Sequence, residues 1–521
     1  MKDSYSAPYK IKEIIQETPS VKSFKIYSSK ISKAKPGQYV LVRVFEPKEL
    51  SDEIPISIAS VGLREGYPYI ELAVAEVGEC TKAIHGKHVG DELGIRGPFG
   101  NGFSFYGDNF LLVGGGYGNA VLKSFAERTL MSGKNVTIAI GAKESSELLY
   151  KDRFKILGFD VFTATEDGSE GTKGLVTDLL PSLFEANAFD SVKTCGPELM
   201  MKKVLDYAKM HNIQGEASID RMIKCGYGIC GSSDLGGVPV CTHVIRDWEE
   251  LENTEFGRWH RDETGKRIPF VGDGISSPHR ETIITEKDPL LSVNIFGIDF
   301  PICIGGSSGV RSSSSLSLYE LVKEGAGFHV TKSCGLNPNK PFPGPNFVIH
   351  HGRPINAFGL PNPGIKNYGI EIRDLKNWTP NIPIFVSAIG KTIEEISSVI
   401  KYAEDLGANA AEWNGSCPHV KEINWNDPKL VLEAGMEIRK HVRIPVIFKM
   451  SPDLGVEKSV EVAKAVDEAG LNGITVSNTT KVFQNYPNSI SVLGNASGGE
   501  SGKVLVEKNL KTIYRIYEEL P

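Results

Sequence analysis

The stretch IPIFVSAIGKTIEEISSVIKYAEDLGANAAEWNGS, residues 382–416, decides the fold of the second half of the chain. A short apolar run is followed by a segment whose apolar residues recur every three to four positions, and then by a second apolar run that ends in Asn, Gly and Ser. This pattern predicts a strand, a helix and another strand, and repeated βα units form parallel sheets.

The same pattern recurs on both sides of this stretch. Polar residues stand where each strand ends, which is typical of a TIM-type barrel with its active site at that end. We expect a barrel over residues 285–521 that lacks its last two βα units, since six strands are counted and closure needs eight. The six expected strands are 300–306, 326–333, 382–390, 409–416, 444–451 and 472–480.

The first half of the chain has three further parts. Short apolar alternations in residues 1–105, such as QYVLVRVF at 38–45, predict antiparallel strands in a small β-barrel. Residues 106–212 change to buried strands followed by helices, which predicts an α/β nucleotide domain. Residues 213–284 are rich in glycine and then polar, and we interpret them as a cysteine loop and a linker.

Composition narrows the class of function. The chain has 521 residues and a formal net charge of -6, which gives no basic field for nucleic acid or anionic lipid. No stretch has the 18 or so apolar residues that a membrane span needs, and MKDSYSAPYK at the start lacks an apolar signal core. We expect a cytoplasmic protein that acts on a small molecule, and a homo-oligomer stays open.

Two glycine turns follow buried strands in the α/β part. LLVGGGYGNA at 111–120 brings backbone N–H groups to the start of a helix, where a phosphate can bind, and TCGPELMMKK at 194–203 repeats the arrangement. Together they favour a nucleotide site over tight turns without a ligand.

Three of the eight cysteines lie in CGYGICGSSDLGGVPVC, residues 225–241. Cys225 and Cys230 have a C-x4-C spacing and Cys241 adds a later thiol, which is the plant-type way of binding a [2Fe–2S] cluster. Ser233 stands in the remaining ligand position. Because a serine oxygen is harder and far less acidic than a thiol, we expect a labile cluster; the alternative is a loop without metal.

Residues 5–245 resemble the electron-transfer subunit of the NAD-linked dihydroorotate dehydrogenases. The matching segments are IPISIAS, VGECT, GIRGPFGNGF, LLVGGGYG, TEDGSEGTKGLVTDLL, TCGPELM and the cysteine loop, in the family's order. The family usually has arginine where Ile54 stands. The resemblance implies FAD contacts at Ile54, Pro55, Ile56, Ser57, Ala73, Val74, Ala75, Cys80 and Thr81, and NAD contacts at Gly114, Gly115, Gly116, Gly118, Cys195, Gly196 and Pro197.

The second half resembles the catalytic subunit of the same enzymes. VTKS, NAFGLPNPG, NGSCPH, PVIFKMSPD, TVSNTT and GGESG occur in the expected order. The resemblance implies that orotate is held by Lys332, Asn356, Asn414, Asn478 and Thr479. It also implies that FMN is faced by Ser333, Lys449 and Gly502, and that Cys417 is the general base.

These resemblances imply the oxidation of dihydroorotate to orotate, with electrons passing from FMN through the cluster to FAD and NAD. Two alternatives stay open. His419 stands where these enzymes usually have asparagine, and the related dihydropyrimidine dehydrogenases have a similar SCPH, so the chain could reduce another pyrimidine or a small electron carrier. The other alternative is a truncated flavin-binding product without turnover, in which Cys417 is an inert thiol.

Overall fold

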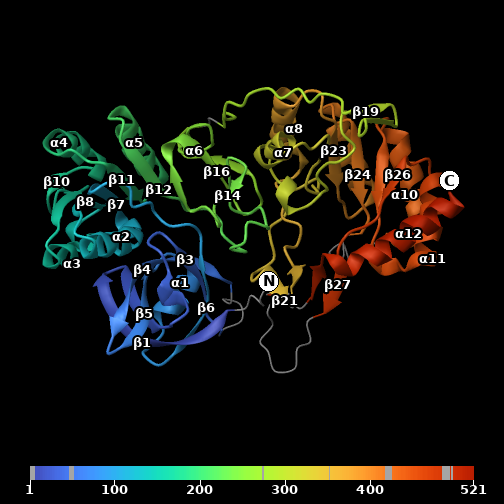
Figure 1. The fold of residues 1–521 in the computed structure, drawn as a ribbon. Helices are drawn as coiled ribbons and strands as arrows, with labels where there is room; N and C mark the ends of the chain where they lie inside the picture. The colour runs from blue at the N-terminus through green and yellow to red at the C-terminus, as the bar shows by residue number, and fades with distance from the viewer. Residues whose placement is uncertain are drawn as a thin grey trace.

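The computed structural model describes residues 6–45, 52–272, 275–350, 352–416, 425–483, 493 and 497–520. Figure 1 shows the N-terminal β-barrel and an α/β sheet on one side and a second, parallel sheet with its helices on the other. The segment that carries β14, β16 and α6 lies between them. The chain therefore has two halves joined by the part expected to hold the cysteine loop.

The N-terminal strands close into a six-stranded antiparallel barrel in the order β1-β2-β5-β4-β3-β6. Strand β3 is buried along its whole length, and the interior is filled by aliphatic residues such as Val40, Ile58 and Leu72. The predicted barrel is confirmed. Its strands are β1 (Ala7–Thr18), β2 (Val21–Tyr27), β3 (Tyr39–Arg43), β4 (Ile54–Arg64), β5 (Tyr67–Ala75) and β6 (Glu92–Phe99).

A seven-stranded sheet follows, in the order β10-β9-β8-β7-β11-β12-β15. Strands β7 to β12 pair in parallel and β15 joins antiparallel to β12, so the sheet extends past residue 212. Its strands are β7 (Asn109–Gly115), β8 (Asn135–Ala142), β9 (Asp160–Thr165), β10 (Thr172–Lys173), β11 (Ser191–Cys195), β12 (Gln214–Ser218) and β15 (Ile245–Asp247). Its helices are α2 (Asn119–Met131), α3 (Lys151–Ile156), α4 (Leu180–Ala186) and α5 (Glu198–Met210).

The segment expected to be a linker is folded. After the hairpin of β13 (Asp234–Leu235) and β14 (Val238–Pro239) come the short helix α6 (Trp248–Glu252) and the hairpin of β16 (Trp259–Arg261) and β17 (Arg267–Pro269). Trp259 is fully buried. The segment is ordered because its polar side chains find partners both within the hairpin, where Asp262 accepts from Thr264, and in the second half, where Arg267 contacts Glu371.

The second half contains a parallel sheet of five strands, β20-β23-β24-β25-β26. The expected strand at 300–306 is absent from this sheet: Phe300 pairs with Val293 in an antiparallel hairpin, and beyond it Cys303 N–H donates to Leu291 O and Gly327 N–H to Ile304 O as single bonds. The strands are β20 (His329–Val330), β23 (Ile384–Ala388), β24 (Ala410–Asn414), β25 (Val446–Lys449) and β26 (Gly473–Thr475). The helices are α7 (Ser315–Lys323), α8 (Ile365–Trp378), α9 (Ile393–Asp405), α10 (Pro428–His441), α11 (Val456–Glu468) and α12 (Val506–Glu519).

Two antiparallel sheets, neither expected from the sequence, accompany the parallel one. The larger has the order β21-β22-β28-β27, and its strands come from the segments between parallel strands and from the segment before α12. Its strands are β21 (Phe347–His350), β22 (Arg353–Asn356), β27 (Thr480–Phe483) and β28 (Ser497–Glu500). The smaller is the hairpin of β18 (Val293–Ile295) and β19 (Ile298–Phe300).

One hydrophobic core crosses the boundary between the halves. It contains residues of the α/β sheet, the three cysteines of the loop, and Phe347, Ile349 and Phe358 of the second half. The rings of Tyr227 and Phe347 lie 6.5 Å apart. The cysteine loop is therefore buried between both halves of the chain.

Candidate functional site

The cysteine loop brings its three thiols and the Ser233 hydroxyl together. Cys225, Cys230, Ser233 and Cys241 are all at most 3% exposed. Backbone N–H groups point at the sulfurs: Tyr227 N lies 3.3 Å from Cys225 Sγ and Gly228 N lies 3.1 Å from Cys241 Sγ. Such donors stabilise thiolate sulfur, so the loop fits an iron–sulfur cluster.

The thiols also act on one another. Cys230 and Cys241 donate toward Cys225, which holds the pKa of the Cys225 thiol well below its usual value. Among the described residues, no three His, Cys, Asp or Glu side chains are placed to share a single metal ion. A [2Fe–2S] cluster has two irons and four protein ligands, so it needs two ligand pairs rather than one triad. The Ser233 hydroxyl, which accepts from Cys241 N at 3.2 Å, is the group that would complete the second pair.

A buried ion pair that sequence reasoning missed holds this loop against the N-terminal barrel. Arg96 on β6 and Glu53 are each about 5% exposed and form a two-pronged contact. Arg96 Nη1 also donates to the Cys225 carbonyl at 2.8 Å. A buried arginine without a carboxylate would be costly, so Glu53 makes this position of Arg96 possible. The signal in the sequence was an arginine inside the matched segment GIRGPFGNGF.

At the carboxyl ends of the parallel strands, the predicted polar residues contact one another. Asn414 at the end of β24 donates to Ser333 Oγ at 2.9 Å and accepts from Ser416 Oγ at 2.7 Å. Asn478 donates to the same Ser416 hydroxyl at 2.8 Å. Three of the predicted residues, from three different strand ends, thus belong to one hydrogen-bonded network with Ser416.

Glu412 is the member of this network that sequence reasoning did not find. It is 4% exposed and accepts from Ser387 Oγ at 3.0 Å and from Thr475 Oγ1 at 3.1 Å. The Lys449 ammonium lies 3.6 Å from Glu412 and 3.4 Å from the Ser308 carbonyl. A glutamate in the middle of the apolar strand AAEWN was the available signal, because a buried carboxylate needs partners.

Lys332 lies at the border between this network and the cysteine loop. One pocket is lined by Lys332 and Ser333 after β20, by Cys230 and Ser232 of the loop, and by the 261–265 turn of the β16–β17 hairpin. Burial lowers the pKa of Lys332 to about 8, opposed by the Cys230 and Cys334 thiols. Among the described residues no carboxylate pairs with Lys332, so its ammonium group suits an anionic ligand.

The remaining predicted residues of the second half are placed less uniformly. Asn356 ends β22 and donates to Gly499 O at 3.2 Å. Thr479 also lies against Gly499, because a Cβ there would be 2.1 Å from Thr479 Oγ1. Asn356 and Thr479 therefore meet at Gly499 of the antiparallel sheet. Gly502 is exposed, and among the described residues a Cβ there would approach only Pro354 Cδ, at 3.9 Å. Cys417 and His419 lie outside the described residues.

The two glycine turns of the α/β sheet lie against each other. Strand β7 pairs with β11 in a register that puts Gly114 beside Cys195. A Cβ on Gly118 would lie 2.5 Å from the Cys195 carbonyl oxygen, and one on Gly115 would lie 2.9 Å from Pro197 Cδ. Gly196 meets the Gly115 backbone, whereas Gly116, with a φ of 55°, faces open space. The turns therefore form one surface beside the start of α2, where a phosphate would bind.

The predicted FAD segments also converge. Ile58 on β4 pairs with Leu72 on β5, so residues 54–57 and 73–75 lie at the same end of this strand pair. Helix α1 (Glu79–His85) follows β5 directly, and Thr81 Oγ1 accepts from Val77 N at 3.0 Å and from Gly78 N at 2.8 Å. Burial raises the pKa of Cys80, and the Asp52 charge raises it further. Asp52 pairs at 2.6 Å with Lys224, the residue before Cys225, so this end of the barrel borders the cysteine loop.

Comparison with known proteins divides the chain in the same way. A family model described as Dihydroorotate dehydrogenase matches residues 290–521. A probable dihydroorotate dehydrogenase B (NAD(+)) electron transfer subunit of Methanocella arvoryzae is 38% identical over 262 residues, which cover 49% of this chain and 96% of that protein. The dihydroorotate dehydrogenase B (NAD(+)) catalytic subunit of Methanocaldococcus jannaschii is 34% identical over 235 residues, covering 44% of this chain and 76% of that protein.

Among solved structures, that of an NADH-dependent reduced ferredoxin-NADP oxidoreductase is similar, with 30% identity and a TM-score of 0.43 over 47% of this chain and 92% of that one. In the described part of the chain, no helix has the length and apolar character that crossing a membrane requires.

Proposed function

Because the chain belongs to the NAD-linked dihydroorotate dehydrogenase B family, with the electron-transfer part fused ahead of the catalytic part, we propose that it oxidises dihydroorotate to orotate and passes the electrons to NAD. The reaction removes a proton from C5 and a hydride from C6 of the substrate. The parts of the chain that would serve these steps follow one another from the parallel sheet through the cysteine loop to the α/β sheet.

The polar network at the strand ends would bind the substrate. The Lys332 ammonium would pair with the carboxylate of dihydroorotate, because this group has no carboxylate partner among the described residues. Asn356, Asn414 and Asn478 offer amide groups that match the amide edges of the ring, and Thr479 adds a hydroxyl. Cys417, which follows Ser416 in the sequence, would take the C5 proton.

When bound, FMN and FAD would handle electron pairs and the cluster single electrons, while the protein positions these groups. Ser333 and Lys449 have the hydroxyl and the cation that suit a flavin at the strand ends, and Gly502 would lie at the same cofactor. The converging segments 54–57, 73–75 and 80–81 would hold FAD, and the two glycine turns would hold NAD. Cys225, Cys230, Ser233 and Cys241 would hold the cluster.

One observation carries this proposal: Cys230 and Lys332 line the same pocket. A residue proposed to ligate the cluster and a residue proposed to bind the substrate thus lie next to each other, although 102 positions of one chain separate them. That placement suits an enzyme in which electrons leave the substrate end through the cysteine loop. Clustered thiols also favour a reducing compartment, so we place the activity in the cytoplasm.

The test uses the full chain supplied with FMN, FAD, iron and sulfide. Addition of dihydroorotate and NAD should yield orotate and NADH. Lys332→Ala should lose oxidation of dihydroorotate and keep the reduction of ferricyanide by NADH, which needs the N-terminal half alone. Faster oxidation of dihydrouracil or dihydrothymine than of dihydroorotate would contradict the assigned substrate.

The assignment of Cys417 has its own test. Cys417→Ser keeps the size of the side chain and raises its pKa greatly, so bleaching of the flavin by dihydroorotate should slow by roughly 10²–10⁴-fold, the usual effect of losing a positioned base. Binding of orotate should not change. Equal rates and equal pH profiles for the variant and the parent, measured by stopped flow, would exclude Cys417 as the base.

A further inference from the structure

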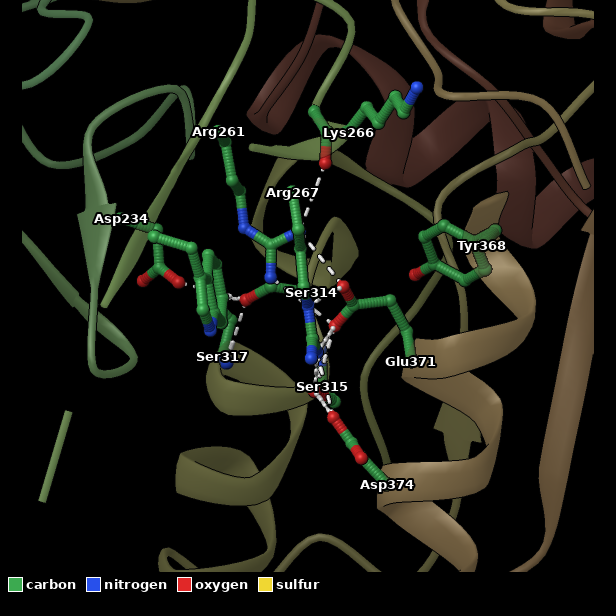
Figure 2. Close-up of polar contacts among 12 residues, drawn as sticks. Asp234, Arg261, Lys266, Arg267, Ser314, Ser315, Ser317, Tyr368, Glu371 and Asp374 are labelled. Atoms are coloured by element: carbon green, nitrogen blue, oxygen red, sulfur yellow. Dashed lines mark hydrogen bonds and ion pairs between the residues drawn. The ribbon is translucent and has the colours of Figure 1, made fainter. Parts of the chain in front are cut away.

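The β16–β17 hairpin sends an arginine into the second half of the chain. Arg267 is 3% exposed, and its Nε and Nη2 atoms each lie 2.8 Å from one carboxylate oxygen of Glu371 on α8. Nη2 also lies 2.7 Å from Asp374, one turn further along the same helix. Figure 2 shows this guanidinium between the two carboxylates of α8 and Ser315 of α7.

A second arginine and a tryptophan of the hairpin strengthen this contact. Arg261 Nη1 lies 2.9 Å from Glu371, and the guanidinium groups of Arg261 and Arg267 lie 5.1 and 4.5 Å from the Trp259 ring. Trp259 itself packs in a small hydrophobic cluster with Leu316, Tyr319 and Trp378 of α7 and α8. The hairpin therefore contacts the parallel-sheet half through both charge and apolar area.

The segment after the hairpin stays on the same helices. Ile283 N–H donates to the Trp378 carbonyl at 2.7 Å, and the Glu281 carbonyl accepts from Tyr319 Oη at 2.9 Å. Arg280 Nη2 donates back to Gly236 O of the cysteine loop at 3.1 Å. The segment of residues 259–272 and 275–285, here named the clamp segment, thus ties the cysteine loop to α7 and α8.

The two halves depend on each other at this contact. Glu371 and Asp374 are at most 6% exposed, and buried carboxylates are costly without cations. Burial alone would raise the pKa of Glu371, yet Arg261 and Arg267 bring it well below its usual value. The cations that offset the burial of these two carboxylates of α8 therefore come from the clamp segment.

The clamp segment also borders the proposed electron path. Its 261–265 turn lines the pocket that Cys230 and Lys332 share. The loop itself contacts the second half nearby, where Ser314 Oγ donates to Asp234 at 2.8 Å and Arg311 Nη1 to Gly228 O at 3.3 Å. The clamp segment therefore fixes one wall of this pocket relative to the other.

We propose that the clamp segment holds the cysteine loop against the parallel sheet of the same chain, so that electrons pass between the two halves without a second polypeptide. The contacts described above place the clamp segment whatever the function of the chain is. Its role in electron transfer rests on the function proposed above.

The first experiment measures the contact without any cofactor. A protease site placed between the exposed residues Glu286 and Lys287 leaves the clamp segment on the N-terminal fragment. After cleavage of the full chain, the fragments should elute together in size-exclusion chromatography. Arg267→Gln should weaken their association about 10²-fold, because it leaves buried carboxylates short of a cation. Lys266→Gln, which changes an exposed neighbour whose side chain points away in Figure 2, should have no effect.

A triple variant covers the case in which Arg267→Gln fails to fold. Arg267→Met with Glu371→Gln and Asp374→Asn removes this arginine and both carboxylates, so the helix keeps no unpaired carboxylate while the clamp loses its ionic contact. Arg261 keeps its charge and retains the Gly265 carbonyl as an acceptor at 2.9 Å. The two fragments of the cleaved triple variant should separate at a higher protein concentration than those of the parent. Separation of the cleaved parent, or equal association of the parent and both clamp variants, would overturn the proposal.

The second experiment tests electron transfer within one chain. In the loaded parent, oxidation of dihydroorotate by an artificial acceptor and reduction of ferricyanide by NADH report the two halves separately. Both should survive in the clamp variants while formation of NADH from dihydroorotate falls at least about tenfold. A mixture of the Lys332→Ala and Cys225→Ser chains should not regain that overall reaction; recovery in the mixture would show transfer between chains and contradict the proposal. Failure of both partial reactions in the parent would count against the proposed function alone, since the fragment test is independent of it.

Discussion

Ser233 is the residue that most affects what the cysteine loop can hold. Its hydroxyl lies within the group of three buried thiols and accepts from Cys241 N at 3.2 Å. An oxygen ligand is harder than sulfur and far less acidic than a thiol, so iron bound here is expected to leave easily. The geometry of the loop supports a cluster, whereas the chemistry of this one atom weakens it.

Ser233→Cys should therefore raise the iron and acid-labile sulfide recovered per chain after anaerobic purification. The sulfur would complete the set of four thiols in a loop whose N–H groups already face sulfur. Ser232→Cys, which changes the neighbouring position, is the matched control and should not raise the iron content. Equal iron content in the parent and the Ser233→Cys chain, or none in either, would contradict the assignment of this position.

His329 makes stability depend on pH. It is fully buried at the start of β20, where Nε2 lies 3.1 Å from Thr379 Oγ1, and burial lowers its pKa from 6.5 to about 4. Between these two values the unfolded chain takes up a proton that the folded chain does not, so stability falls as the pH falls below about 6.5. At pH 5 the loss from this residue is about 2 kcal/mol.

Denaturant unfolding between pH 7 and pH 5 would measure this effect. His329→Gln keeps an amide that can reach Thr379 and cannot titrate, so it should remove about 2 kcal/mol of the pH dependence. A variant whose stability changes with pH as much as that of the parent would show that His329 is protonated in the folded chain.

At the scale of elements, the cysteine loop packs closely against the 3₁₀ turn Val310–Ser312 before α7. Gly231 has a φ of 68°, and a Cβ there would lie 2.0 Å from the Val310 carbonyl oxygen. Backbone cannot move aside as a flexible side chain can, so this contact needs glycine. The turn and the loop are thereby held in one relative position.

Gly231→Ala should push the loop away from the turn and speed hydrogen exchange in residues 226–232. Gly325→Ala is the matched control, because Gly325 also has a positive φ, 98°, but nothing lies within 4 Å of its Cβ position. The cost of the left-handed conformation alone, about 1 kcal/mol, should appear in both variants. Exchange that is equally slow in the loop of both variants would show that the contact with Val310 is not needed.

Elements also mark what could be predicted from the sequence. Ser333, Asn414 and Asn478 could be placed together because carboxyl ends of parallel strands meet at one edge of a sheet. The strand expected at 300–306 has the right apolar pattern, but a pattern does not show whether a neighbouring strand accepts its backbone bonds. For the same reason the antiparallel sheet that carries Asn356, and whose strand β27 begins directly after Thr479, was not foreseen.

At the scale of the whole molecule, contacts between distant segments were beyond prediction. Arg267 and Glu371 are 104 positions apart, and neither residue type in its own segment indicates the other. The partners of Glu412 likewise come from three different strands. The sequence indicates which strands and helices form and in what order. The buried ion pairs that hold one half against the other depend on the packing of the complete chain.

The core shared by the two halves also has a consequence for synthesis of the protein. The loop thiols at 225–241 share their core with Phe347, Ile349 and Phe358, which are translated roughly a hundred residues later. At the usual rate of about 5–20 residues per second, that delay is on the order of ten seconds. Until these three residues are added, the core around the cysteines is incomplete, so the loop of the growing chain is less covered than that of the finished protein.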